Sequence, residues 1–498
     1  MAITNGSNLN SVAASQRQTL ASNYLDLAST AGQGWAQQYV PDLMEKEAEV
    51  FGNRTISGFL SQVGAEESMT ADQVVWSEQS RLHLSYVGTL DVDGDTNGTF
   101  TVTTDIDGNA PTDFTTQHGI RVNDMVLIAQ AGVVVKALCT EAEVGTAVVT
   151  LEPYANDILD DELADGTATL LVIGSEFGKG QSYSDQTGTH SSERREALEP
   201  TFKSYSNKPI IMKDYYEISG SDASQVGWVE VSGEMGQSGY LWYLKAAGDT
   251  RARFTDYLEM AMLEAEKTAA DSAIGFADKQ IRGSADAGTN AGTEGLFAAI
   301  ESRGNVTSGV TGVNAATDLA EFDAILAEFD NQGAIEENMM FVNRSTSLAM
   351  DDMLASMNSY GAGGTSYGVF DNSEDMALNL GFSGFRRGSY DFYKSDFRYL
   401  NDKATRGGIN SRATSAAIRG VIIPAGVSSV YDQALGRNMK RPFLHVRYRA
   451  SQTDDRRLKT WVTGSVGAAT SALDAMQIHY LSERCLVTQG ANNFMLMK

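Results

Sequence analysis

The amino-acid sequence predicts an α+β fold that carries a small all-β domain as an insertion. Three patterns favour this class. Residues 86–174 alternate β-branched and polar positions in short runs, residues from about 234 to 282 follow helical spacing, and residues 441–498 return to alternation. At 498 residues the chain is too long for one simple core, so two to four domains or subdomains are expected.

The composition is that of a folded chain with an acidic surface. Hydrophobic residues make up 42% and aromatic residues 9% of the sequence, and the formal net charge is −26. This charge argues against coating nucleic acid or an anionic bilayer through the whole surface. Cys139 and Cys485 are the only cysteines, so no disulfide framework is predicted and a reducing compartment fits. We expect neither a classical export signal nor a membrane-spanning segment.

The first half of the chain divides into three segments. Residues 1–75 are polar and loosely patterned, and we expect an arm rather than a core. Residues 86–174 predict a unit of five or six strands, which holds 15 Asp and Glu against only Arg121 and Lys136. This unit therefore carries about half of the net negative charge. Residues 175–215 predict an extended hairpin arm that returns into a strand.

One long helix is predicted from about residue 234 to residue 282. At 1.5 Å per residue, about 40 residues would extend about 60 Å, which is longer than most globular domains need. Arg253, Glu259 and Glu266 are expected to face solvent or neighbouring subunits. The candidates for packing against the subunit's own sheet recur at three- and four-residue steps and are Phe254, Leu258, Ala261 and Ala265.

The second half predicts a mixed domain followed by long strands. Residues 296–360 indicate two helices that flank a strand, with Ser345 as the N-cap of the second helix. The stretch 383–460 holds 16 Lys and Arg against six Asp and Glu, so it is basic. Such clusters favour salt bridges between subunits over direct DNA binding, because the whole-chain charge opposes DNA. The candidate interface charges are Arg386, Arg387, Lys440, Arg441, Arg456 and Arg457.

The motifs that resemble sites of chemistry are incomplete. Gly178 and Lys179 follow a predicted strand, but the spacing of a phosphate loop is missing. Asp91, Asp93 and Asp95 start like a calcium loop that lacks its glycine and its terminal glutamate, so an acidic turn is the better interpretation. The histidines stand singly, at His83, His118, His190, His445 and His479. We therefore expect no enzyme, no catalytic residue, no cofactor and no metal.

The order of these parts resembles the major capsid protein of tailed bacteriophages, which has the Hong Kong 97-type fold. A polar arm, an extended hairpin, a long helix, a mixed domain and a return to long strands follow one another. The segment KDYYEISGS, the helical segment that ends in RARFTDYLEMAMLEAEK, and the closing SERCLVTQGANNF look most like the head proteins of T-even-like and marine myoviruses.

The resemblance implies a domain assignment. The expected domains are an N-terminal arm at 1–75, an E-loop region at 76–85 and 175–215, an acidic all-β insertion at 86–174, a peripheral domain at 216–295 and 441–498 with the spine helix at about 234–282, and an axial domain at 296–440. The insertion departs from the minimal fold, and its role as decoration or as a clamp between capsomers stays open. Leu43, Met44 and Glu45 match the cleavage pattern of T-even-like heads, although such a tripeptide is common by chance.

The function implied is that of a major head protein, which self-assembles into hexamers and pentamers of an icosahedral capsid. Such a protein encloses double-stranded DNA without reading its sequence, and its partners are itself, a portal and cement or vertex proteins, with no membrane. Its location is the virion, after assembly in the host cytoplasm. Two alternatives stay open. One is another self-assembling virion part such as a vertex, tail tube or sheath protein, and the other is a hydrolase in the β unit with convergent carboxylates.

Overall fold

A computed structural model gives the structure of the protein and divides the chain into two compact units. One unit comprises Ser77–Ser204, and the other joins Met1–Trp76 with Tyr205–Lys498. The residues that the structure describes are 65–79, 83, 85–92, 98–106, 108, 118–142, 147–155, 159–180, 202–224, 231–232, 238–239, 242–268, 292–333, 335–357, 384–412, 416–425, 427–432, 437–466 and 469–498.

The smaller unit contains a closed six-stranded antiparallel barrel in the order β3-β4-β7-β6-β5-β8. Its strands are β3 (Ser85–Asp91), β4 (Gly98–Asp105), β5 (Asp124–Gln130), β6 (Val133–Ala142), β7 (Val148–Pro153) and β8 (Gly166–Ser175), and a short 3-10 helix, η4, covers Leu159–Asp161. Alternate residues point inward, and Leu90, Phe100, Ile128 and Leu170 are fully buried. The alternating pattern in the sequence therefore fills one apolar interior.

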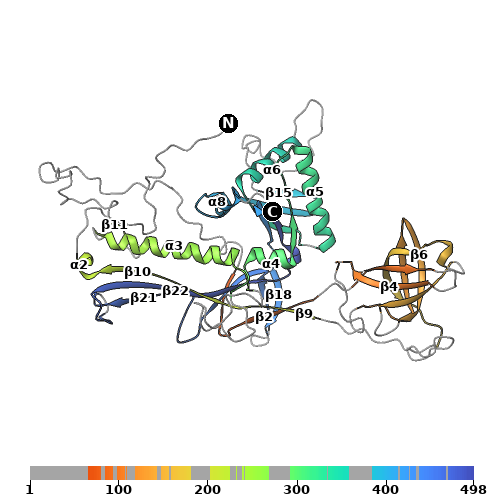
Figure 1. Ribbon diagram of the computed structural model, residues 1–498, viewed down its shortest axis with the longest axis horizontal. Helices are drawn as coiled ribbons and strands as arrows, with labels where there is room; N and C mark the ends of the chain where they lie inside the picture. The colour runs from red at the N-terminus through yellow and green to blue at the C-terminus, as the bar shows by residue number, and fades with distance from the viewer. Residues whose placement is uncertain are drawn as a thin grey trace. The chain divides into compact units, whose positions relative to one another are not determined.

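The larger unit contains a long sheet in which the two ends of the chain meet. The order is β1-β20-β22-β10, and β21 also pairs with β22. These strands are β1 (Ala65–Met69), β10 (Ile210–Ser219), β20 (Leu444–Arg449), β21 (Lys459–Gly464) and β22 (Ala475–Thr488). Helix α3 (Trp242–Glu264) lies along β10 and β22 (Figure 1). Strand β22, the longest of the described strands, pairs with β10, β20 and β21, and β1 joins the sheet through β20.

A second sheet of the same unit has the order β13-β23-β17-β14-β16-β15. Its strands are β13 (Asn305–Thr307), β14 (Glu337–Val342), β15 (Gly384–Arg387), β16 (Tyr390–Asp396), β17 (Gly420–Pro424) and β23 (Met495–Met497). Helices α5 (Ala315–Gln332) and α6 (Arg344–Met357) pack on one face through Phe322, Phe329 and Met353 (Figure 1). The other face shares an apolar core with α3, with α4 (Leu296–Arg303) and with the long sheet.

Short elements connect these layers. They are the strand pairs β2 (Val74–Gln79) with β9 (Phe202–Asn207), β11 (Val231–Ser232) with β12 (Ser238–Gly239), and β18 (Val427–Asp432) with β19 (Arg437–Pro442), and the helices α2 (Gly220–Ala223), α7 (Arg398–Asn401) and α8 (Arg406–Asn410). The pair β2–β9 forms the two-stranded arm from which the chain leaves for the barrel and returns.

The helix predicted at about 234–282 is shorter in the structure. Residues 238–239 belong to a strand, α3 spans Trp242–Glu264, residues 265–268 are not helical, and residues 269–282 of the prediction are outside the described residues. At its end the backbone N–H of Ala265 still donates to Ala261, at 2.9 Å, but the Ala265 carbonyl accepts from Gly295 at 2.7 Å. A Cβ on Gly295 would lie 2.8 Å from the Ala265 nitrogen, so glycine permits this close approach. The hydrogen bond from Gly295 to Ala265 therefore accompanies the end of the helix.

Three domain boundaries and one cap also differ from expectation. Residues 65–69 form a strand of the long sheet instead of part of an arm, and residues 210–215 lie in β10 of that sheet. The last strand, 495–497, belongs to the second sheet, where it pairs with β13 and β17 and all three of its side chains are buried. The side chain of Asn343, rather than Ser345, caps α6 by accepting from the Thr346 N–H at 2.8 Å.

Candidate functional site

The sheet-facing side of α3 is built on Phe254 and Leu258. Their exposed fractions are 1% and 2%, and both pack against Tyr480 of β22. The rings of Phe254 and Tyr480 lie 6.1 Å apart, and the Tyr480 hydroxyl donates to the Ala247 carbonyl of α3 at 3.0 Å. An apolar stripe at helical spacing thus joins the long helix to the longest strand.

The remaining candidates on this helix occupy different positions. Ala261 is partly buried against the core that both sheets share, whereas Ala265 lies just beyond the last helical residue. Arg253, expected to face solvent or neighbouring subunits, is 21% exposed, and its guanidinium pairs with Asp214 of β10 at 3.1 Å. Glu266 is exposed, beyond the end of the helix. The charged side of α3 therefore contributes to the contact with its own sheet.

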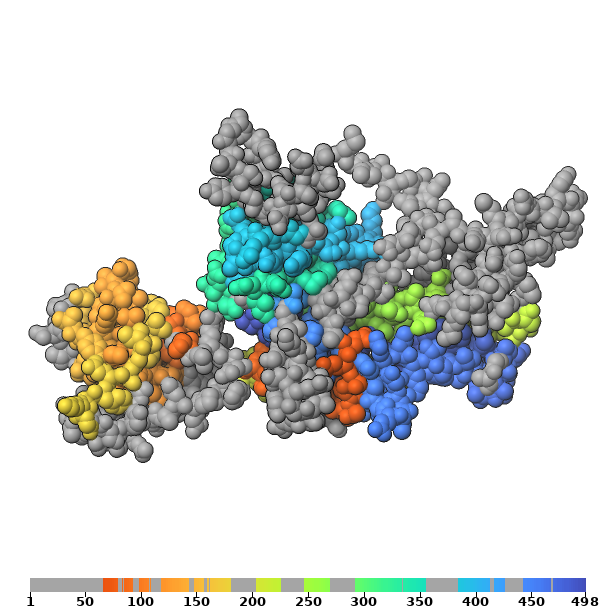
Figure 2. Space-filling model, turned by 180° about the vertical axis from the view of Figure 1, so that it is seen from behind, coloured from red at the N-terminus to blue at the C-terminus, as the bar shows by residue number. Residues whose placement is uncertain are grey.

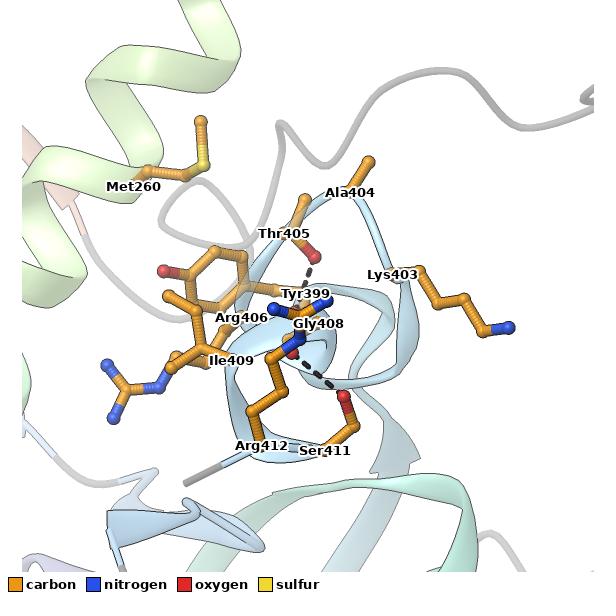
Figure 3. Close-up of a pocket in the computed structure, with 10 residues that line it drawn as sticks. All are labelled: Met260, Tyr399, Lys403, Ala404, Thr405, Arg406, Gly408, Ile409, Ser411 and Arg412. Carbon is orange, nitrogen blue, oxygen red and sulfur yellow. Dashed lines mark hydrogen bonds between the residues drawn. The ribbon is translucent and has the colours of Figure 1, made fainter. Parts of the chain in front are cut away.

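An open pocket of about 590 Å³ lies where α3 meets α7 and α8 (Figure 3). Arg406 donates to Glu264 at 2.7 Å, and the hydroxyl of Tyr399 donates to the same carboxylate at 2.8 Å. Burial, followed by the charge of Glu264, raises the pKa of Tyr399. Lys403 and Arg412 are exposed at the pocket. The described lining therefore presents positive charge beside apolar surface, which suits contact with an acidic partner.

Four of the six candidate interface charges have carboxylate partners inside the subunit. Arg387 makes two hydrogen bonds to Asp323, at 2.5 and 2.8 Å, and Arg386 lies 3.6 Å from Asp391. The other two pairs are Arg456 with Glu483, at 2.9 Å, and Arg457 with Glu66, at 2.5 Å. Lys440 and Arg441 lie in β19, and their side chains are outside the described residues.

Sequence reasoning did not find an aromatic row on the face of the long sheet opposite α3. Tyr215, His479 and Trp461 are register partners on three adjacent strands, and the His479 ring stacks on Trp461 at 5.1 Å and on Tyr215 at 6.0 Å. The Thr463 hydroxyl lies 2.7 Å from Nε2 of His479. Only strand register brings these residues together, so no spacing in the sequence indicates the row.

The motifs considered for chemistry lie only partly in the described residues. Asp91 ends β3, whereas Asp93 and Asp95 are outside the described residues. Lys179 and Gly180 form a turn, and the residues that follow Gly180 are outside the described ranges. Within the described ranges, no group of three or more His, Cys, Asp or Glu residues could hold a metal.

The two cysteine thiols are buried, and the described helices are not of the membrane-spanning type. Cys139 and Cys485 are both buried, and burial raises the pKa of Cys485 to about 12. Among the helices that the structure describes, none combines the length and the apolar composition that crossing a membrane would require.

No protein-family model and no curated protein matches the chain. Solved structures do match it. The capsid structure of Cyanophage P-SCSP1u is 8% identical and has a TM-score of 0.37, with 92% of each chain covered. The capsid of an empty GTA particle is 11% identical, with a TM-score of 0.35 and coverage of 95% of this chain and 98% of that chain. The mature capsid of bacteriophage PhiM1 is 7% identical, with a TM-score of 0.35 and coverage of 92% and 91%. Each of these three structures is a capsid.

Proposed function

We propose that this chain is the major capsid protein of a tailed phage, which self-assembles into the hexamers and pentamers of an icosahedral head. The observation that carries the proposal is the path of the chain. Strands β2 and β9 pair as an arm, β10 leads from the arm into the long sheet, and α3 then lies on that sheet. After the second sheet, β20–β22 return and complete the first. This is the order of parts that the resemblance implies.

The domains take their roles from this order. The β2–β9 arm corresponds to the E-loop, α3 to the spine helix of the peripheral domain, and the second sheet with α5 and α6 to the axial domain at capsomer centres. The acidic barrel is the insertion, as decoration or as a clamp between capsomers. The region before β1 corresponds to the N-terminal arm.

The function is mechanical rather than catalytic. Arms that lie over neighbouring subunits extend each contact, and obligate assemblies commonly bury about 2,000 Å² or more per interface. We assign three cations to contacts with neighbouring subunits. They are Arg386, whose side chain is 63% exposed, and Lys403 and Arg412 at the α7–α8 pocket. The particle encloses double-stranded DNA, and an acidic lining would keep that DNA from sticking. Portal and cement or vertex proteins complete the virion, after assembly in the host cytoplasm.

Electron microscopy of the purified full-length protein tests the proposal. Closed shells or hexameric capsomers are the expected result. Tubes or contractile sheaths would instead favour the alternative of a tail protein. A monodisperse monomer that turns over a substrate would contradict the proposal and point to the carboxylates of the barrel.

A further inference from the structure

Strand β1 is attached to the long sheet in a way that differs from its neighbours. Among the described strands it pairs only with β20, in parallel, from Ala65 opposite His445 to Met69 opposite Arg449. The orange-red surface of this region lies directly beside the blue surface of the C-terminal strands in Figure 2. Of its four described side chains, only that of Met69 is buried. Apolar burial therefore contributes little to holding this strand.

Ion pairs hold β1 from both faces of the sheet. Glu66 lies 2.5 Å from Nη2 of Arg457 and 3.9 Å from Nη1 of Arg484. Glu67 lies 2.8 Å from Nη1 of Arg447. Successive residues of a strand point to opposite faces, so the two glutamates contact arginines on opposite sides of the sheet.

A third carboxylate follows directly after the strand. Asp72 pairs with Arg449, and the side chain of Asp72 is 89% exposed. Its partner Arg449 is the last residue of β20 and the register partner of Met69. All three carboxylates of this segment are therefore paired with arginines of the C-terminal strands and their connection.

Three of these four arginines have second partners that do not belong to β1. Arg449 lies 3.6 Å from Glu483, and Arg457 stacks over the Tyr448 ring at 5.7 Å. Arg484 donates from Nε to the Ser482 hydroxyl and from Nη2 to the Arg457 carbonyl, both at 2.9 Å. If β1 left, the guanidinium groups of Arg449, Arg457 and Arg484 would keep polar or aromatic contacts, whereas Arg447 would lose its ion pair with Glu67.

The rest of the sheet and the next strand are fixed independently. Leu444, Val446 and Leu486 lie in the core that is shared with α3 and α4, and β1 adds no residue to that core. Residues 70–73 are exposed. Beyond them, Trp76 of β2 is buried, with Arg303 of α4 over its ring at 5.6 Å. An exposed connection therefore separates β1 from an anchored β2.

We propose that β1 is an ionic latch, a strand that leaves the sheet reversibly when its ion pairs are screened or neutralised, while β20 and β22 stay folded. The latch decides whether the chain before residue 65 is fastened to the sheet. This proposal does not depend on the capsid function, because it concerns the single subunit.

Hydrogen–deuterium exchange of the full-length, unassembled protein tests the latch. Raising NaCl from 0.1 to 1 M shortens the Debye length from about 10 to about 3 Å. We expect exchange in peptides covering 65–73 to accelerate by about ten-fold, since screening weakens several pairs that each contribute modestly. Exchange in β20 and β22 should stay unchanged.

Charge-neutral variants supply the second arm of the test. In the Glu66→Gln, Glu67→Gln variant, residues 65–73 should exchange fast already at 0.1 M NaCl, and the dependence on salt should largely disappear. Glu217→Gln, on the edge strand β10, is the matched control and should leave the exchange of β1 unchanged. Salt-independent exchange in the unmodified protein, or exchange of β1 only together with β22, would overturn the proposal.

Discussion

At the scale of single residues, the contact between α3 and the long sheet depends on very few side chains. Phe254 and Leu258 are the buried residues that α3 adds to the cluster around Tyr480. Met262 and Leu263, one turn further, enter the larger core between the two sheets. The apolar stripe of one helix thus joins two separate cores, and a change at Leu258 affects the position of the whole helix.

Leu258→Asp is predicted to abolish soluble subunits. Removal of a buried leucine side chain costs about 2–5 kcal/mol, and a carboxylate in the same place adds the cost of desolvating a charge. The total approaches the stability of a typical domain. Soluble expression and circular dichroism provide the measurement. Leu258→Met, which nearly conserves volume, should lose less than about 1.5 kcal/mol. Normal shells from the aspartate variant would show that α3 packs elsewhere.

At the scale of elements, the barrel closes on itself and so has no edge strand within its ring. Its interior is filled around Phe100, which is fully buried. A Cβ on Gly88 would lie 2.6 Å from the Phe100 ring, at the point where the register of β3 shifts. The barrel therefore has a core of its own, separate from the cores of the larger unit.

Phe100→Ala should destabilise the barrel by about 3–5 kcal/mol, because it leaves a cavity in that separate core. In differential scanning calorimetry, the unfolding transition of the barrel should move to lower temperature. The transition of the larger unit should keep the temperature that it has in the unmodified protein. Phe322→Ala, in the core under α5, should produce the reverse pattern. A single transition that shifts as a whole in both variants would mean that the two units unfold together.

The elements differ in how well the sequence predicts them. The strands of the barrel and β22 follow from alternation, because each repeats its pattern over several residues. The end of α3 does not, because helical spacing continues through residue 269 while Gly295 pairs with the Ala265 backbone. A contact between residues 30 positions apart leaves no local pattern. The same reason explains why local spacing does not indicate which sheets residues 65–69 and 495–497 join.

At the scale of the whole molecule, charge is segregated along the sequence. Residues 86–174 carry 15 acidic against two basic residues, and residues 383–460 carry 16 basic against six acidic residues. Opposite patches on one chain favour ordered contacts between copies and speed their encounter. Part of the basic charge is already paired within the subunit, as with Arg387 and Asp323.

Assembly is therefore predicted to weaken with salt. Between 0.1 and 1 M NaCl, the rate at which light scattering rises should fall by about ten-fold or more, because screening removes electrostatic steering. A neutral osmolyte at matched osmolarity, which does not screen charge, serves as the control. A rate that is the same at both salt concentrations would mean that apolar contacts alone drive assembly.

By itself the sequence determined the classes of element, the acidic inserted β unit, the separation of charge and the resemblance to phage capsid proteins. These depend on composition, on short-range periodicity and on the order of segments, which can all be read along the chain without knowledge of tertiary contacts. The tertiary structure alone decided where α3 ends, that β1 belongs to the long sheet, and that Glu66, Arg457 and Arg484 meet. Those features depend on contacts between positions that are 30 residues apart, at the end of α3, or hundreds of residues apart, at β1, and only the folded chain brings such positions together.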